Sequence, residues 1–297
     1  MTIDISKLPS IASSNLLCTL SVSVWEGRRK DKNIEEEVAA AKGARSRRAT
    51  SVYKQLFVDS PALENIKTLR NEARLYLNRY TQPWNDNGER TLPVSTYYEE
   101  IEQGMASYGR RFNQLVDVLA DNWNTEISKQ AFERGSMFDR SEYPDVSEIR
   151  SKFSFDFNVR PMPLAGDFRL DVGNEALQKL QSLYEAEMQR CVQRAMGDAW
   201  DRLRQHVEWI RERCAAVLEH DGEGKKPKLY ESMIDNGVEL CEILRTLNIT
   251  NDPALEEART QLHKALLSTD IDSLRESKEV QEKLKNAADS IADKFDW

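Results

Sequence analysis

The longest regular pattern in the chain is an apolar stripe that runs from Asn174 to His220. Apolar side chains recur there at steps of three or four residues, Pro is absent and Gly occurs once, which predicts one long amphipathic helix. The stripe consists of Leu177, Leu180, Tyr184, Met188, Cys191, Ala195, Ala199, Leu203, Val207, Ile210, Cys214 and Val217. A helix of this length, roughly 65 to 70 Å, needs an equally long partner to cover its apolar side.

A second helical pattern runs from Pro93 to Phe132, with steps that alternate between four and three residues as in a coiled coil. Its stripe consists of Tyr98, Ile101, Met105, Tyr108, Phe112, Leu115, Leu119, Trp123 and Ile127. We therefore predict that 93–132 and 174–220 pair as a long antiparallel helical hairpin. Gly104 and Gly109 each cost about 1 kcal/mol of helix stability, so we expect them to let another helix backbone approach closely.

Alternation of apolar and polar residues predicts β-strands at 16–24 and 153–159. A short return strand is expected at 168–172, after a turn-forming segment. A hairpin of two strands alone is only marginally stable, so we expect the N-terminal strand to join the other two in a small antiparallel sheet. The β element at about 150–172 is thus an insert between the two long helices.

The other patterns complete a mainly α fold. We expect an extended arm before residue 16, a loop at 82–91, a linker at 221–227, and helices at 34–41, 44–57, from Pro61 onward, 229–247, 253–267 and 278–295. The fold class is therefore a long antiparallel, coiled-coil-like helical hairpin with a small antiparallel β element and a C-terminal helical bundle. The predicted parts are an N-terminal strand and helical arm at 1–92, the hairpin at 93–220 and the C-terminal helices at 221–297.

Composition narrows the class of protein. The chain has 297 residues, of which 40% are hydrophobic and 31% charged, with a net charge of -8, so only a local basic patch would attract a polyanion. The four cysteines are widely spaced, which favours reduced core residues over a disulfide framework. We find no run of 18 apolar residues and no signal-peptide pattern, so we expect a cytoplasmic protein with no membrane partner.

Motifs that carry catalysis or metal binding are absent from the sequence. The segment Gly222–Lys226 lacks the spacing of a phosphate-binding loop, and no G-x-S-x-G nucleophile motif occurs. His206, His220 and His263 lie far apart, without a Cys or His set of zinc-site spacing. Carboxylates are abundant, but no spacing distinguishes an acid from a base. We predict no enzyme activity, no catalytic residues, no cofactor and no metal.

One basic cluster stands out in this acidic chain. Between Arg28 and Lys54 there are nine Lys or Arg residues and four Asp or Glu residues, with Trp25 and Tyr53 as flanking aromatics. Such clusters contact phosphates, and aromatics stack on unpaired bases. The alternatives are a solvated helix face or a docking patch for an acidic partner, including another copy of this chain. The candidate binding residues are Arg28, Arg29, Lys30, Arg45, Arg47 and Arg48.

Several short motifs carry a family resemblance. They are Trp25-Glu-Gly-Arg-Arg-Lys-Asp31, Lys152-Phe-Ser-Phe-Asp-Phe157, Pro161-Met-Pro163 and Asp167-Phe168-Arg169. In this order the chain resembles, over about residues 16–219, an uncharacterised protein family of bacteriophages and integrative mobile elements. Members are often encoded near a MoxR-type AAA+ ATPase that resembles the cobalt chelatase small subunit, and sometimes near recombination genes. The resemblance implies an accessory or scaffold role beside an ATPase or in phage DNA metabolism, and it identifies no catalytic residues.

These observations give two functional hypotheses. We favour a non-enzymatic structural or adaptor protein of phage or mobile-element origin, which forms a homo-oligomer or docks on an AAA+ ATPase. The faces of the long helices outside the hairpin seam would bind these partners. The alternative is a nucleic-acid-binding accessory protein in phage DNA metabolism or recombination, which uses the Arg28–Lys54 basic patch.

Overall fold

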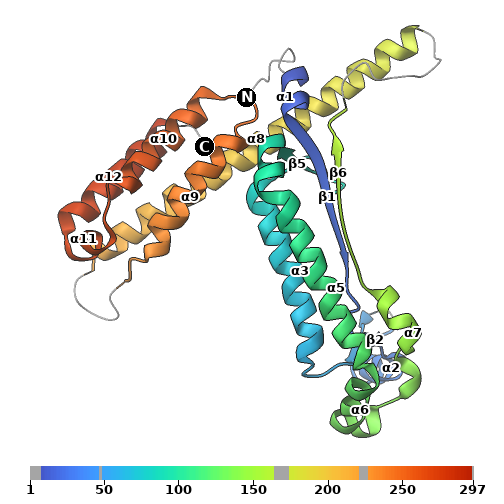
Figure 1. The fold of residues 1–297 in the computed structure, drawn as a ribbon. Helices are drawn as coiled ribbons and strands as arrows, with labels where there is room; N and C mark the ends of the chain where they lie inside the picture. Colours follow the sequence, from blue (N-terminus) through green and yellow to red (C-terminus); the bar gives the residue numbers. More distant parts are fainter. Residues whose placement is uncertain (1–7, 47–48, 164–173, 221–226, 296–297) are drawn as a thin grey trace. The chain divides into compact units, whose positions relative to one another are not determined.

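The computed structural model describes residues 8–46, 49–163, 174–220 and 227–295 (Figure 1). The protein is mainly α-helical and contains a small antiparallel sheet, in agreement with the predicted class. The chain divides into two compact units, and each combines segments distant in sequence. Unit 1 comprises Met1–Thr19, Leu77–Ile101 and Asn158–Trp297, and unit 2 comprises Leu20–Tyr76 and Glu102–Phe157. The three parts predicted from the sequence, 1–92, 93–220 and 221–297, are continuous segments, whereas each unit of the structure combines segments that are distant in sequence.

The long helix α8 (Asn174–Leu218) organises the core of unit 1, and its bounds match the predicted helix closely. From Met188 to Val217 the predicted stripe is buried in one hydrophobic core with residues of the C-terminal helices. These helices are α9 (Glu231–Leu247), α10 (Pro253–Leu267), α11 (Ile271–Glu276) and α12 (Lys278–Lys294). The predicted C-terminal bundle therefore covers the apolar side of α8.

The second helical pattern is divided in the structure. It forms α4 (Val94–Thr96), the π-helix η3 (Tyr97–Ile101), α5 (Glu102–Asp121) and α6 (Trp123–Arg134). In unit 2 the buried side of α5 shares a core with α3 (Pro61–Tyr80), where Phe112 and Leu119 lie with Leu63 and Ile66. The predicted pairing of 93–132 with 174–220 is not confirmed, because the stripe of 93–132 is divided between the two units and its part in α5 and α6 is buried in the core of unit 2.

The glycines of α5 make room for aromatic side chains. A Cβ atom added to Gly104 would lie 2.3 Å from the hydroxyl oxygen of Tyr76, which belongs to α3. A Cβ added to Gly109 would lie 3.4 Å from Cδ1 of Phe155. Our expectation of a close helix backbone at these glycines is therefore wrong, because their neighbours are rings.

The main sheet has the strand order β4 (Gln82–Pro83), β5 (Arg90–Pro93), β1 (Asn15–Ser23) and β6 (Ser154–Pro161). The alternating patterns predicted β1 and β6 correctly, whereas the expected strand at 168–172 lies outside the described residues. Strand β5 instead pairs antiparallel with β1, and Leu17 is opposite Thr91. The loop predicted at 82–91 is in fact a tight β4–β5 hairpin, closed where the Asn85 side chain accepts hydrogen bonds from the backbone N–H groups of Asn87 and Glu89.

The N-terminal segment also differs from the prediction. Residues before 16 were expected to be extended, but Leu8–Ser14 forms the short helix α1, with Ile11 buried in the core of unit 1. In unit 2 the chain from α6 to β6 passes through η4 (Gly135–Met137), η5 (Arg140–Glu142), α7 (Val146–Ile149) and η6 (Arg150–Lys152). These short helices connect α6 to the strand that returns along unit 2 (Figure 1).

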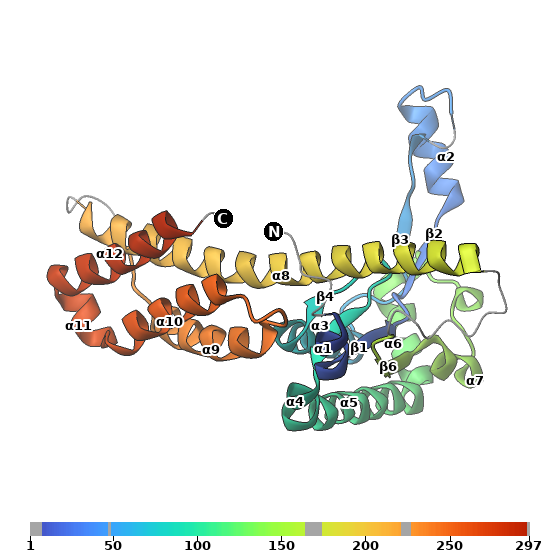
Figure 2. The same cartoon turned by 90° about the horizontal axis from the view of Figure 1, so that it is seen from above.

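The basic cluster forms a separate substructure of unit 2, which we call the arm (residues 28–55). It contains β2 (Arg28–Lys30), α2 (Lys32–Ala41) and β3 (Tyr53–Gln55), with α2 at the far end of the β2–β3 ribbon (Figure 2). The predicted helix at 44–57 is wrong, because Tyr53–Gln55 pairs antiparallel with β2. Gly27, with a φ of 63°, accepts a 2.6 Å hydrogen bond from the Leu56 N–H at the base of this ribbon.

Candidate functional site

The ribbon of the arm has two chemically different faces. Arg28 is opposite Gln55 and Lys30 is opposite Tyr53, which places these four side chains on one face. The guanidinium carbon of Arg28 lies 5.6 Å from the centre of the Tyr53 ring, a cation–π contact between diagonal neighbours. Tyr53 is 54% exposed, so this outer face presents an aromatic ring and two cations to solvent.

The inner face carries Arg29 opposite Lys54, and acidic groups of unit 2 neutralise it. The Lys54 ammonium lies 2.5 Å from the carboxylate of Glu142 and 3.8 Å from that of Asp31. The pKa of Asp139 is lowered, mainly by hydrogen bonds from Ser141 and further by the positive charges of Lys54 and Arg29. These inner cations therefore hold the ribbon against η5 (Arg140–Glu142).

Helix α2 is attached to the ribbon by its first residues. Asp31 caps the helix by accepting hydrogen bonds from the backbone N–H groups of Asn33 and Ile34. Lys30 forms a 3.0 Å ion pair with Glu35, whose side chain is buried. One of the two outer cations is thus already paired, whereas the described residues offer Arg28 no carboxylate within 4 Å.

The structure places three of the six predicted binding residues on one strand of the arm. Arg28, Arg29 and Lys30 share β2, and Arg45 is exposed in the loop that leads from α2 to β3. Arg47 and Arg48 lie outside the described residues. Lys32 and Lys42, which are also exposed, add further positive charge to the arm. The outer face of the arm is therefore the strongest candidate site for an anionic partner.

Of the two flanking aromatics, Trp25 does not belong to this site. Its ring makes edge contacts with Phe57, at a centroid distance of 5.2 Å, and with Trp123, at 5.3 Å. Phe57 and Trp123 are stacked on one another, so Trp25 belongs to the core of unit 2. Only Tyr53 remains as a flanking aromatic that could stack on a ligand.

Our sequence reasoning missed a second exposed feature of unit 2, at the end of α6. Phe132 is 86% exposed, and Met137, in the following turn η4, is 52% exposed. The signal was present in the sequence, because Phe132 does not continue the spacing of the stripe that ends at Ile127. We call Phe132 and Met137 the apolar tip.

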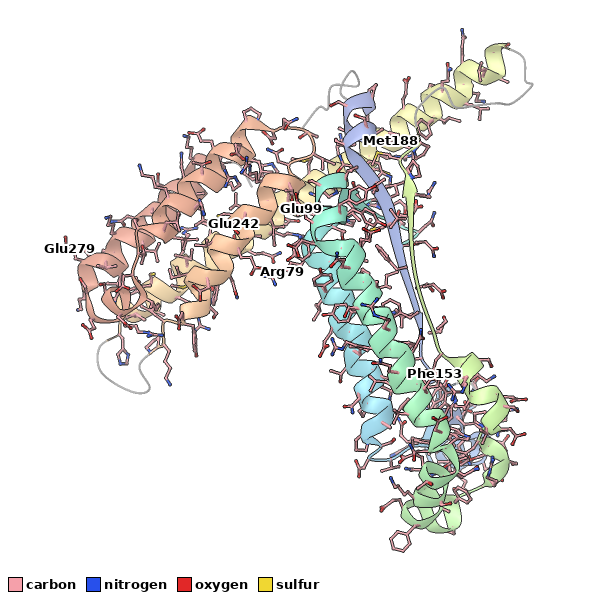
Figure 3. The ribbon with its side chains drawn as sticks, viewed as in Figure 1. Arg79, Glu99, Phe153, Met188, Glu242 and Glu279 are labelled. Atoms are coloured by element: carbon pink, nitrogen blue, oxygen red, sulfur yellow. The ribbon has the colours of Figure 1, made fainter. Side chains whose placement is uncertain are left out.

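Unit 1 contains a polar cleft between the segment 95–99 and helices α9 and α10. Its volume is about 720 Å³, and it is lined by Ser95, Glu99, Glu242, Arg245, Thr246, Arg259 and His263. Figure 3 shows Glu99 and Glu242 at the opening between these elements. The hydrogen bonds between Arg259 and Glu256 raise the pKa of Arg259 and lower that of Glu256, so this pair stays ionised. The pair fixes the Arg259 side chain, which lines the cleft, against its own helix α10.

A partly buried polar network in unit 1 has a structural role. Arg202 donates hydrogen bonds to the carbonyl oxygens of Asn78, Arg79 and Thr81, and it lies 2.8 Å from Asp198. Burial raises the pKa of Asp198 and lowers that of Arg90, against the opposing charges around them. Arg202 and Arg90 donate hydrogen bonds to the carbonyl groups at the end of α3, as helix termini require, and Asp198 pairs with Arg202.

The cysteines have the properties of core residues. All four are buried and free, and burial raises the pKa of Cys18 and Cys241 to about 12 and that of Cys191 and Cys214 to about 11. Thiols of this kind are poor nucleophiles, because the reactive species is the thiolate. Among the described residues, no group of three or more His, Cys, Asp or Glu side chains is arranged to hold a metal ion.

Comparisons with known proteins identify no relative: no family model, no curated protein and no solved structure matches the chain. In the described part of the chain, none of the helices has both the length and the apolar character needed to cross a bilayer.

Proposed function

We propose that the protein is a non-enzymatic structural or adaptor protein of phage or mobile-element origin that acts in the cytoplasm. It binds protein partners, either further copies of itself or an AAA+ ATPase. The observation that carries this proposal is the apolar tip of unit 2, where Phe132 is 86% exposed and Met137 is 52% exposed. Burying a side chain such as Phe132 contributes about 1.5–3 kcal/mol, which makes the tip a favourable point of contact.

Helix α6 holds Phe132 in a fixed position. On the opposite side of this helix, the indole N–H of Trp123 donates a 2.9 Å hydrogen bond to the Pro144 carbonyl oxygen. The Gln130 side chain accepts a hydrogen bond from the Val58 N–H at 2.7 Å and donates one to the Val58 carbonyl at 3.0 Å. The inner side of α6 is anchored in this way before any partner binds. Little conformational entropy of the helix is therefore lost when a partner binds Phe132.

Light scattering over a range of concentrations tests self-association, and a binding assay with a MoxR-type AAA+ ATPase, the class of partner that the family resemblance implies, tests the second partner. Replacing Phe132 by Ser should weaken the interaction roughly 10-fold or more, as expected for a central apolar anchor. Leu75→Ser is the matched control, because Leu75 is 70% exposed on α3 of the same unit. A protein that stays monomeric at high concentration and does not bind the ATPase contradicts the proposal.

A second candidate function, nucleic-acid binding, is favoured by a different observation, the cation–π pair of Arg28 and Tyr53 on the exposed face of the arm. Nucleic-acid binding would involve residues of the arm and not those of the apolar tip. The two functions are therefore compatible and can be tested separately.

A further inference from the structure

We infer that the arm (residues 28–55) binds single-stranded nucleic acid, with Tyr53 as the stacking surface for a base and the exposed cations around it as phosphate contacts. This inference rests on the second candidate function, nucleic-acid binding, and deepens it by naming the class of nucleic acid and the role of Tyr53. It rests on the shape of the arm, on the distribution of its charges and on the exposed aromatic ring.

Most side chains in the described part of the arm are exposed. Helix α2 buries only Glu35 and Ala39, and the chain reaches and leaves it through the two short strands of the ribbon (Figure 2). The cations of β2, α2 and the following loop can therefore approach a flexible polymer from an extended element. Basic arms of this kind commonly bind nucleic acids.

The charges of the arm are sorted by face. On the inner face, Glu142 and Asp31 hold Lys54 in ion pairs within unit 2. On the outer face, Lys30 is paired with Glu35, whereas Arg28 lies over the Tyr53 ring and forms no ion pair with a described carboxylate. The exposed cations Lys32, Lys42 and Arg45 have no recorded ion pair within the described residues. A chain with a net charge of -8 thus leaves a small group of cations available to phosphates.

Tyr53 favours unpaired bases over an acidic peptide as the ligand. An acidic peptide needs cations but no aromatic surface, whereas an unpaired base gains about 1–3 kcal/mol by stacking on a ring, roughly 5- to 150-fold in affinity. The bases of a duplex are already stacked on one another. The Arg28 guanidinium lies against the Tyr53 ring and adds a planar cation beside the same base.

The experiment measures binding of a fluorescently labelled oligothymidylate to the full chain by anisotropy, over a range of salt concentrations. The expected result is a steep loss of affinity with salt. In the double variant Arg28→Glu with Arg45→Glu, the salt slope should fall by about 1.4, which is about 0.7 for each phosphate contact to single-stranded nucleic acid. Lys278→Glu with Lys283→Glu is the matched control, because it changes the net charge equally at exposed positions of α12.

Three further variants separate the contribution of base stacking from that of the phosphate contacts. Tyr53→Ala should weaken binding at least about 5-fold, whereas Tyr53→Phe, which keeps the ring, should bind like the wild type. Arg45→Glu alone tests the phosphate contacts without disturbing the ribbon, because Arg45 lies outside β2 and β3 and forms no ion pair with another described residue. Circular dichroism checks that each variant is folded.

Several results would overturn the inference. They are an absence of binding at low salt, an unchanged affinity in the double variant, and a duplex affinity equal to that for the single strand with no effect of Tyr53→Ala. Loss of self-association or ATPase binding in the arm variants, without any nucleic-acid binding, would assign the arm to an acidic protein partner instead. Loss of binding in the Phe132 assays would leave this inference intact, since the two tests use different residues and ligands.

Discussion

The imidazole Nε2 of His206, on α8, lies 3.0 Å from the backbone carbonyl oxygen of Met233, on α9. With Nε2 as the donor, this hydrogen bond joins two helices of unit 1 in the middle of its core. The His206 ring is buried and makes an edge contact with Trp209 at a centroid distance of 5.5 Å. These contacts make His206 a packed residue of the core.

This contact predicts a pH dependence of stability. Burial lowers the pKa of His206, although the Met233 carbonyl opposes the shift. Because the folded protein resists protonation more than the unfolded chain does, His206 contributes stability fully above the unfolded pKa of about 6.5. That contribution is lost as the pH falls through the lower folded pKa. The Tm should therefore decrease below pH 6.5, and less so in His206→Gln, with His263→Gln as the control. Equal pH profiles in all three proteins would contradict this prediction.

The close approach of α8 and α9 depends on Gly237. A Cβ atom added to Gly237 would lie 2.3 Å from Nε2 of His206 and 2.6 Å from Cδ1 of Leu266. Ala normally stabilises a helix by about 1 kcal/mol relative to Gly, but here the overlap should lower the free energy of unfolding by about 1–3 kcal/mol.

Gly197→Ala is the control for that experiment, because a Cβ added to Gly197 on α8 would meet no atom within 4 Å from another element of the described structure. This variant should be stabilised by up to about 1 kcal/mol. Denaturant unfolding measures both changes. If Gly237→Ala were as stable as Gly197→Ala, the packing of α8 against α9 would differ from the structure.

The sequence predicted which side of each helix is buried better than it predicted the partner. Helix α8 begins at Asn174 and ends at Leu218, because its stripe repeats with the helical period over its whole length. The stripes of α3, α5 and α8 consist of similar aliphatic and aromatic residues, so periodicity cannot say which pairs will pack. Strand β5 was missed because four residues in a polar context, Arg90–Pro93, are too few for a period-two pattern.

The candidate site was predicted in composition but not in arrangement. The excess of Lys and Arg marked the arm, but three-residue strands such as β2 have no recognisable period, so the separation of Arg28 from Arg29 by face was not foreseen. Trp25 and Tyr53 looked equivalent as aromatics beside the cluster. Only the tertiary contacts of Trp25 with Phe57 and Trp123 show that one ring belongs to the core and the other to the surface.

An ion triad joins α8 to α12. The Asp289 carboxylate accepts hydrogen bonds from Lys285 at 2.7 Å and from Arg211 at 2.6 Å, and these bonds lower the pKa of Asp289. A lowered folded pKa means that this stability is present above the unfolded pKa and is lost as the pH falls through the folded one. Since the three side chains are partly exposed, Asp289→Asn should cost only about 0.5–1 kcal/mol at neutral pH.

The control for the ion triad is Asp293→Asn, since Asp293 is an exposed residue of α12 that forms no ion pair with the described part of the chain. Urea unfolding at neutral pH and at low pH measures the difference. The two variants should differ at neutral pH and converge once the carboxylates are protonated. A constant difference across this range would show that Asp289 acts through packing and not through its charge.

The four cysteines predict how the thiols respond to reagents. Cys18, Cys191, Cys214 and Cys241 are buried, and their raised pKa values of about 11 to 12 keep them in the thiol form at neutral pH. In the native protein a thiol reagent such as DTNB should therefore react slowly, at the rate at which the core opens. In denaturant all four should react at once. Rapid reaction of one thiol in the native protein would show a locally open core, and Cys191, beside the exposed side chains of Glu187 and Arg190, would be the first to replace by Ala.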